Sequence, residues 1–319
     1  MADTTLPPLT ADLRCAPQAV ELGLDPLGTA AGCRTLVLVE SAGLWPARIE
    51  EAPDLRDLPP LGQECRVLAT RGEDAGPQPT VTVWRAGDDL RFAGTDYRVE
   101  PGRLAEVLED LVAAAAAGGR GGLPRGVEAL GPAPQEVLIC GHGRRDQCCG
   151  SFGIRLLAET SARPGQAAWS GVRVRRCSHT GGHRFAPTGI TLPDGRAWAF
   201  LDIDTLEAVI ADRPLPSLAD HNRGLLALDP WEQVAEGSIY RAVGPAWTGF
   251  RPRLERIDTE VADADRRTYR VTWTEGADER WATVAVRRSG SVPVPVCGAP
   301  IDEARKSSPV FEFDPVQLG

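Results

Sequence analysis

Hydrophobic and polar positions along the first third of the chain predict a small α/β region. A continuous apolar run at 36–40 predicts a buried strand, and the alternation at 80–84 predicts a second one. From about 102 to 117, apolar residues recur at helical spacing. Glycines at 118–122 are expected to end this helix and to form a linker. We therefore predict an N-terminal α/β region over residues 1–120.

The middle of the chain combines strand patterns with helical ones. The expected elements are a strand at 136–140, a helix over 149–162, a strand at 172–175, a hairpin around Asp194-Gly195 and a helix that Asp204 caps. Their order is β-loop-α-β-loop-β-β-α. That order predicts a thioredoxin-like α/β layer over residues 133–224.

The last third predicts a small α+β extension over residues 225–319. A helix is expected near 230–243, followed by strands at 253–257, 269–273 and 281–286. No internal sequence repeat is visible. The predicted fold class is therefore α/β, with a thioredoxin-like domain between an N-terminal α/β region and a C-terminal α+β extension.

Composition and charge narrow the range of functions. The formal net charge is −9 and the pI about 5.1, which argues against nucleic-acid binding because phosphate contacts need a basic surface. Lys306 is the only lysine, and the arginine-rich, alanine-rich composition indicates a high-GC bacterial gene. The first residues lack the features of a signal peptide, and no apolar stretch is long enough to span a bilayer. We expect a cytoplasmic protein with no membrane partner and with reduced cysteines.

Cysteine and histidine residues gather in one part of the chain. There are eight cysteines and four histidines, and seven of these twelve lie within residues 140–183. The seven are Cys140, His142, Cys148, Cys149, Cys177, His179 and His183. Such density favours metal or redox chemistry in a reducing compartment. Cys15, Cys33 and Cys65 lie outside it and are expected to fill the core, as buried free cysteines often do. Cys297 lies in the short motif Pro295-Val-Cys297-Gly, and the sequence assigns no chemistry to it.

The spacing suggests a binuclear iron site. Cys140 and Cys149 bracket a predicted strand-to-helix loop, and His179 and His183 share a loop after a later strand. Two cysteinates can hold one iron while two imidazoles hold the other, as in Rieske-type ligation. The glycines at 181–182 allow the tight turn that brings both imidazoles to one site.

These motifs resemble the sucrase/ferredoxin-like family, a branch of the thioredoxin-like [2Fe–2S] ferredoxins. The strongest matches are Val137-Leu-Ile-Cys140-Gly-His-Gly-Arg-Arg-Asp-Gln-Cys-Cys149-Gly, Cys177-Ser-His179-Thr-Gly-Gly-His183-Arg-Phe-Ala186 and Leu192-Pro-Asp-Gly195. The resemblance implies a [2Fe–2S] cluster whose ligands are Cys140, Cys149, His179 and His183. Its first cysteine pair is closer than in all-cysteine relatives. Bacterial relatives often have Asp at the last ligand position, where this chain keeps His183.

The neighbouring residues leave alternatives open. Cys148 could replace Cys149 as a ligand, although the following glycine and the family spacing favour Cys149. His142 is expected to support the site as a hydrogen-bond donor or loop residue, and Cys177 to point away from it. The arginines Arg144, Arg145 and Arg184 could offset negative charge or dock an acidic partner, or simply be solvated.

The predicted function is electron transfer with an unidentified redox partner protein, and not catalysis on a substrate of its own. One alternative is a zinc-binding domain that uses the same residues, because two thiolates and two imidazoles also suit zinc. A second alternative is a cluster-free thiol redox protein that works through Cys148 and Cys149. Adjacent cysteines rarely form an unstrained disulfide, and the C-x-x-C motif is absent, which disfavours this reading.

Overall fold

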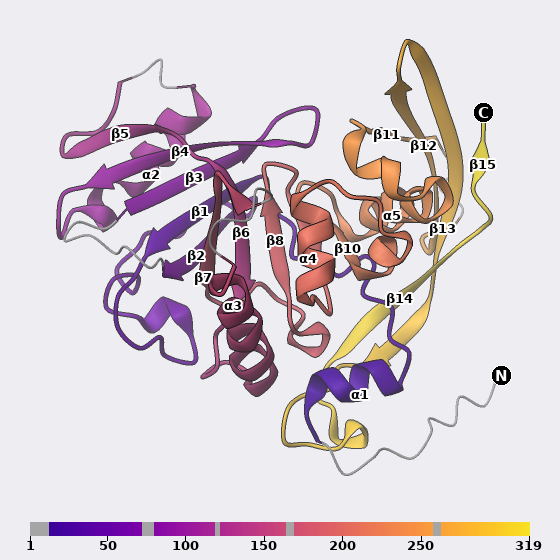
Figure 1. Ribbon diagram of the computed structural model, residues 1–319, viewed down its shortest axis with the longest axis horizontal. Coiled ribbons are helices and arrows are strands. Elements are labelled where there is room, and N and C mark those ends of the chain that lie inside the picture. Colours follow the sequence, from indigo (N-terminus) through magenta and orange to yellow (C-terminus); the bar gives the residue numbers. More distant parts are fainter. Residues whose placement is uncertain (1–12, 72–79, 119–121, 164–168, 258–262) are drawn as a thin grey trace.

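The protein is described by a computed structural model that covers residues 13–71, 80–118, 122–163, 169–257 and 263–319 (Figure 1). Within these residues the strands form two sheets, one ten-stranded and mixed, the other five-stranded and antiparallel. The helices pack around the large sheet and between the two sheets. The predicted α/β class is confirmed.

The first half of the large sheet comes from the N-terminal part of the chain. Its elements are β1 (Thr35–Glu40), the short 3₁₀ turn η1 (Ile49–Glu51), β2 (Cys65–Arg71), β3 (Thr80–Ala86), β4 (Phe92–Val99), α2 (Leu104–Ala116) and β5 (Val127–Pro132). Strand β1 pairs parallel with β2 and antiparallel with β3, and β4 pairs antiparallel with β3 and β5. The strand order is therefore β2-β1-β3-β4-β5.

The second half repeats this plan. Its elements are β6 (Gln135–Cys140), the π-helical turn η2 (Cys149–Gly153), α3 (Ile154–Ser161), β7 (Val172–Cys177), the 3₁₀ turn η4 (His183–Phe185), β8 (Gly189–Leu192), β9 (Arg196–Trp198), α4 (Ile203–Ile210), the 3₁₀ helix η5 (Pro216–His221) and β10 (Asn222–Leu225). Strand β6 pairs parallel with β7 and antiparallel with β8, and β9 pairs antiparallel with β8 and β10. The elements β6 to α4 follow one another as the sequence predicted for a thioredoxin-like layer, and the strand pairing of this half is the same as that of the first half.

The two halves meet edge to edge between β2 and β7. These strands are antiparallel and overlap only at their last residues, where Thr70 pairs with Cys177 and Arg71 with Arg176. The whole sheet consequently reads β10-β9-β8-β6-β7-β2-β1-β3-β4-β5, which is symmetric about this junction. The carboxyl ends of β1, β2, β6 and β7 therefore converge at the centre of the molecule. In α/β sheets, ligand sites form outside the carboxyl ends of strands.

Buried charges tie the two halves together. The fully buried Glu136 of β6 accepts hydrogen bonds from Trp84 of β3, at 3.0 Å, and from Arg173 and Arg175 of β7. Arg173 also donates to both carboxylate oxygens of Asp96 on β4, at 2.7 and 3.0 Å. A buried carboxylate is tolerated here because cationic donors surround it.

The remaining elements form a layer beside the second half. They are α1 (Cys15–Glu21), α5 (Pro230–Val243), η6 (Pro245–Gly249), β11 (Arg253–Arg256), β12 (Arg266–Glu275), β13 (Asp278–Pro293), η7 (Ile301–Glu303), β14 (Ser307–Phe313) and β15 (Gln317–Leu318). Helix α5 spans the predicted range and begins with a capping box between Asp229 and Glu232. Helix α1 lies beside the C-terminal segment at the lower edge of Figure 1.

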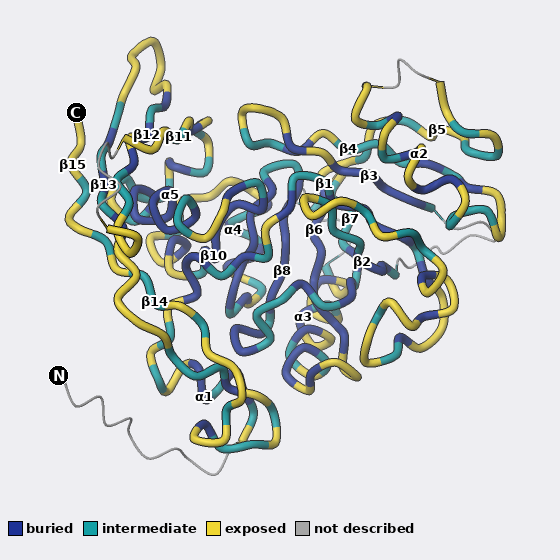
Figure 2. Tube along the Cα trace, turned by 180° about the vertical axis from the view of Figure 1, so that it is seen from behind, coloured by how far each residue is buried: buried dark blue, intermediate teal, exposed yellow. Residues whose placement is uncertain are grey.

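The core explains why β1 and β6 are continuous apolar runs. Both strands are buried on two faces (Figure 2), so neither alternates with polar residues. Along β6, Val137 and Ile139 pack toward α4, α5 and the small sheet, while Leu138 and Cys140 face the opposite side. The cysteines of the site therefore belong to an apolar cluster that Leu36 and Leu38 of β1 continue.

Several sequence expectations differ in detail. The N-cap of α4 is Asp202, which accepts a hydrogen bond from the Thr205 amide, and not the predicted Asp204. Strands β2, β5 and β14 and helix α1 were not expected. The predicted linker falls largely on 119–121, outside the described residues. The domain boundaries stay predictions. No helix in the described ranges has the length and apolarity needed to span a bilayer.

Candidate functional site

The loops that follow β1 and β6 meet at the junction between the two halves of the sheet. His142 Nε2 donates a hydrogen bond to the Pro46 carbonyl, at 2.7 Å, and the His142 ring lies edge-on to Trp45 with a centroid distance of 5.7 Å. His142 therefore holds the two loops together, as the sequence suggested for a supporting residue. The loop after β1 contains no cysteine or histidine. The first half of the large sheet therefore covers the site with this loop, but the loop supplies no thiol or imidazole to it.

Three of the four predicted ligands come together at this junction. Cys140 ends β6, Cys149 opens the π-helical turn before α3, and His179 lies two residues beyond β7. Their ligand atoms all lie within 4.8 Å of one another, and Cys140 Sγ is 4.0 Å from His179 Nδ1. Both cysteines are buried and His179 is half-buried. These three side chains form what we call the first group, which can bind a metal.

The electrostatics of the first group favour a thiolate. The hydrogen bond from the Cys149 thiol holds the pKa of Cys140 well below its usual range, and it outweighs the effect of burial; His179 acts in the same direction. The pKa of Cys149 is correspondingly raised by the same hydrogen bond and by burial. These hydrogen bonds stabilise a thiolate in the first group, and the thiolate is the form of cysteine that binds a metal.

The fourth predicted ligand, His183, lies next to this group but contacts other residues. Its ring centroid is 5.8 Å from that of His179. Its Nδ1 lies 3.2 Å from both Cys15 Sγ and the Asp146 carboxylate. The backbone turn between the two histidines is the predicted tight one, because Gly181 and Gly182 adopt φ of +83° and +66°.

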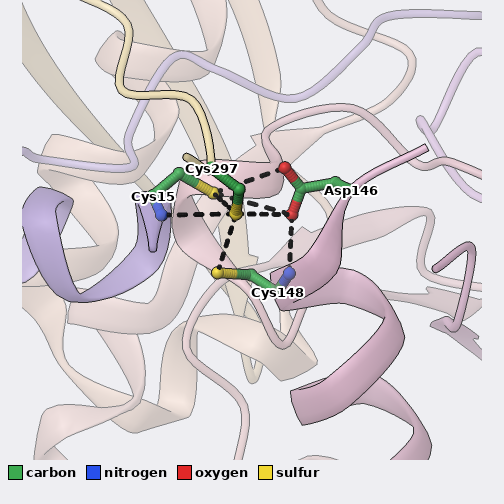
Figure 3. A group of neighbouring side chains, drawn as sticks. All are labelled: Cys15, Asp146, Cys148 and Cys297. Carbon is green, nitrogen blue, oxygen red and sulfur yellow. Dashed lines mark hydrogen bonds between the residues drawn. The ribbon is translucent and has the colours of Figure 1, made fainter. Parts of the chain in front are cut away.

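A second group of ligand atoms lies on the other side of His183. Cys15, Asp146, Cys148 and Cys297 place their ligand atoms within 4.8 Å of one another, and Figure 3 shows the four side chains turned toward a common point. The Cys297 sulfur is 3.4 Å from that of Cys148 and 3.5 Å from that of Cys15. This second group can also bind a metal.

Hydrogen bonds polarise the second group. Backbone amides point at two of its sulfur atoms: the Cys15 amide lies 3.4 Å from Cys297 Sγ, and the Ala16 amide 3.5 Å from Cys148 Sγ. Hydrogen bonds from the Cys148 and Cys15 thiols lower the pKa of Cys297, whereas those with Cys148 and Cys297 raise the pKa of Cys15. One sulfur of the group is thus prepared to carry negative charge.

Buried arginines surround both groups. Arg223 is fully buried, and within the described ranges it donates to the Gly181 and Thr29 carbonyls and pairs with no carboxylate. Burial, together with Arg184 and Arg66, lowers the pKa of Arg223 to about 9, while Cys140 and Cys149 act to raise it. Arg66 donates to the His179 carbonyl at 2.7 Å, and its buried Nη1 has no partner in the described structure. This concentration of positive charge suits an anionic centre.

The other predicted residues separate clearly. Cys177 is buried at the end of β7 and belongs to neither group. Cys33 and Cys65 also lie outside both groups. Arg144 and Arg145 are exposed. Arg184 is buried and donates to the Ser308 hydroxyl, so it is not a surface residue for docking.

Sequence reasoning missed the second group. Cys15 was expected only to fill the core, and Cys297 had no assigned chemistry. The hydrogen-bonded pairs Cys15–Cys297 and Cys148–Cys297 are separated by 282 and 149 residues, so no local spacing connects them. The signal that pointed toward Cys297 was the short Pro295-Val-Cys297-Gly motif.

Comparison with known proteins gives one positive finding. The family model described as Sucrase/ferredoxin-like matches residues 26–224, which include the large sheet except for the last residue of β10, and the whole first group. No curated protein and no solved structure matches the chain.

Proposed function

The chain belongs to the sucrase/ferredoxin-like family, and we propose that it is an electron-transfer protein with a [2Fe–2S] cluster held by Cys140, Cys149, His179 and His183. The observation that carries this proposal is the first group itself. Two cysteines and a histidine from three different elements converge there, and a second histidine lies beside them. A donor set of two thiols and two imidazoles matches Rieske-type ligation.

The surroundings of the first group fit an anionic iron–sulfur centre. Two thiolates and bridging sulfides bring negative charge into a buried place, which is costly unless cations compensate it. Arg223 is buried without a carboxylate partner among the described residues, and Arg66 keeps a buried, unpartnered Nη1. Both guanidinium groups interact electrostatically with Cys140.

When bound, the cluster would supply one-electron transfer. The Cys140 and Cys149 thiolates would hold it from the buried side, and the His179 and His183 imidazoles from the half-exposed side. Arg66 orients the histidine loop through its bond to the His179 carbonyl. Trp45, packed on His142, and the apolar cluster around Leu36 and Leu38 limit the access of water.

The proposed partner is a redox protein with an acidic docking surface. Electron transfer needs an approach to the half-exposed histidines, because the cysteines are buried. Arg144 and Arg145 are exposed in the loop that links the two cysteines. The chain as a whole has a net charge of −9, but the positive charge of these two arginines would attract an acidic partner to this loop.

The test is a UV–visible spectrum of anaerobically purified protein, with iron, zinc and sulfide assayed on the same sample. We expect broad visible bands that bleach with dithionite and about two irons and two sulfides per chain. Loss of iron in Cys140→Ser would assign that iron to the first group. Zinc in place of iron at the first group, or no iron after anaerobic reconstitution, would overturn the proposal.

A further inference from the structure

We propose that Cys15, Cys148, Cys297 and Asp146 form a second metal centre, which binds zinc and ties α1 and the segment after β13 to the loop beside the first group. This centre is separate from the proposed iron–sulfur site. It uses none of that site's four ligands, and its failure would leave the electron-transfer proposal unchanged.

The geometry of the second group is that of a nearly assembled zinc site. Its sulfur atoms are 3.4 and 3.5 Å apart for the two pairs with Cys297. Thiolates around tetrahedral zinc, with Zn–S bonds of about 2.3 Å, lie about 3.8 Å apart. The Asp146 carboxylate approaches Cys15 and Cys297 to within 3.5–3.6 Å. Small shifts of these side chains would therefore accommodate the ion.

The donor set selects zinc over the hard cations. Three of the four ligands are soft thiolates, which suit zinc, and zinc also accepts a carboxylate oxygen, whereas magnesium and calcium require oxygen ligands. Four protein ligands make a closed site without an open position, as in structural zinc centres. Binding forms three Zn–S bonds and one Zn–O bond, and the three thiols release their protons to solvent.

Ordinary core packing does not explain this group. The carboxylate of the buried Asp146 accepts hydrogen bonds from the Cys148 and Cys149 amides and faces His183, and three thiols also gather against it, which is repulsive once the thiols ionise. The amides of Cys15 and Ala16 point at sulfur atoms, where they would stabilise thiolates. A disulfide does not account for the geometry either, because the sulfur atoms of a disulfide lie about 2.05 Å apart, whereas these lie 3.4 and 3.5 Å apart.

Positive charge near the group compensates the thiolates. Arg184 is buried, and its Nε has no partner in the described structure. Cys15 acts electrostatically to raise the pKa of Arg184 against the lowering effect of burial. A zinc ion held by three thiolates and a carboxylate carries net negative charge, which this guanidinium would offset.

The position of the site indicates its role. Cys15 begins α1, Cys297 follows β13, and Cys148 and Asp146 lie in the loop after β6. Two hydrogen bonds to backbone carbonyls also join the region of α1 to the segment around Cys297: the Gly298 amide donates to the Leu13 carbonyl, at 2.9 Å, and the Gln18 side chain donates to the Ala299 carbonyl, at 3.3 Å. Zinc would fasten these segments to the loop that carries Cys149.

The experiment measures zinc and iron together in the full-length chain, expressed with both metals present. We expect about one zinc per chain in the wild type. Cys297→Ser should lose at least ~90% of the zinc, because the three ligands that remain hold zinc more weakly than four. It should keep its iron, because Cys297 is not a ligand of the proposed iron–sulfur cluster. Cys140→Ser should do the reverse. Cys65→Ser is the matched control, since Cys65 lies outside both groups, and should keep both metals.

Two measurements keep the result interpretable if a variant folds poorly. X-ray absorption at the zinc edge of the wild type should show three sulfur neighbours at about 2.3 Å. Limited proteolysis should cut the wild type near α1 faster after zinc is chelated. A wild type without zinc after zinc reconstitution, zinc that survives in Cys297→Ser, or an iron ion in the second group would overturn the proposal.

Discussion

Cys148 and Cys149 follow one another in the chain, yet their sulfur atoms belong to different groups of ligands. Cys149 lies with Cys140 and His179, whereas Cys148 lies with Cys15 and Cys297. The two residues open a helical turn, in which successive side chains point about 100° apart. One loop therefore contributes to both groups of ligand atoms, and its adjacent thiols face different partners.

This arrangement predicts that the two cysteines have opposite effects on metal content. Cys149→Ser should abolish the visible absorption and lower the iron content at least ~10-fold, because a thiolate ligand is lost. Cys148→Ser should retain the iron and its spectrum. The measurement is iron and sulfide analysis with a visible spectrum of both variants. The reverse result would show that Cys148 is the ligand in the first group.

The sequence predicted the central fold because its signals are local. The run before Cys140 reads as a buried strand, and β6 ends at that residue. The duplicated plan was invisible because it concerns strand order and not residue identity. The first crossover contains only the 3₁₀ turn at Ile49–Glu51, where the second contains α3, so the two halves share no helical pattern there. Strand β2 was missed because its apolar residues are interrupted by Arg66.

The candidate site was predictable to the extent that its ligands are close in sequence. Cys140 and Cys149 flank one loop, and His179 follows the neighbouring parallel strand, so their approach follows from the topology. The partners of Cys148 come from α1 and from beyond β13. Their meeting depends on how the extension folds back onto the large sheet, which no periodicity encodes.

The proposed ligation by His183 can be tested by replacing this residue with cysteine. We expect His183→Cys to keep its iron and to have a lower midpoint potential, because an anionic ligand replaces a neutral one and stabilises the oxidised cluster. The shift should be on the order of 100 mV, given the gap between Rieske and plant-type centres. The measurement is a spectroscopic redox titration. His221→Asn is the control, since His221 contacts the Ala199 carbonyl and belongs to neither group. An unchanged potential would contradict ligation by His183.

The ion pair of Asp96 predicts an acid dependence of stability. Burial opposes ionisation of this carboxyl, but hydrogen bonds from Arg173 and Thr82 outweigh it and hold its pKa below the usual value. A group with a depressed pKa contributes stability above its unfolded-state pKa of about 4, and this is lost as pH falls through the folded value. The free energy of unfolding should therefore fall on acidification below about pH 4. Asp96→Asn should show a shallower fall in chemical denaturation; an identical slope in both proteins would refute the assignment.

Gly153 sets how closely the helical turn approaches β6. Its backbone is ordinary helix, with φ −66° and ψ −40°, so conformation alone does not require glycine. A Cβ at this position would lie 1.9 Å from the Cys140 carbonyl oxygen. Gly153→Ala must therefore push the turn away from the strand end, separating Cys149 from Cys140. We expect a destabilisation of about 3 kcal/mol and a loss of iron.

Gly62→Ala provides the control for this prediction, because nothing lies within 4 Å of a Cβ built at Gly62. Its unfolding free energy should change by less than about 0.5 kcal/mol, and its iron content should not change. Denaturant unfolding and iron analysis of both variants are the measurements. If Gly153→Ala kept wild-type iron and stability, the turn would have room that this structure does not provide. The close contact between the start of the turn and the end of β6 would then not be what holds the two cysteines together.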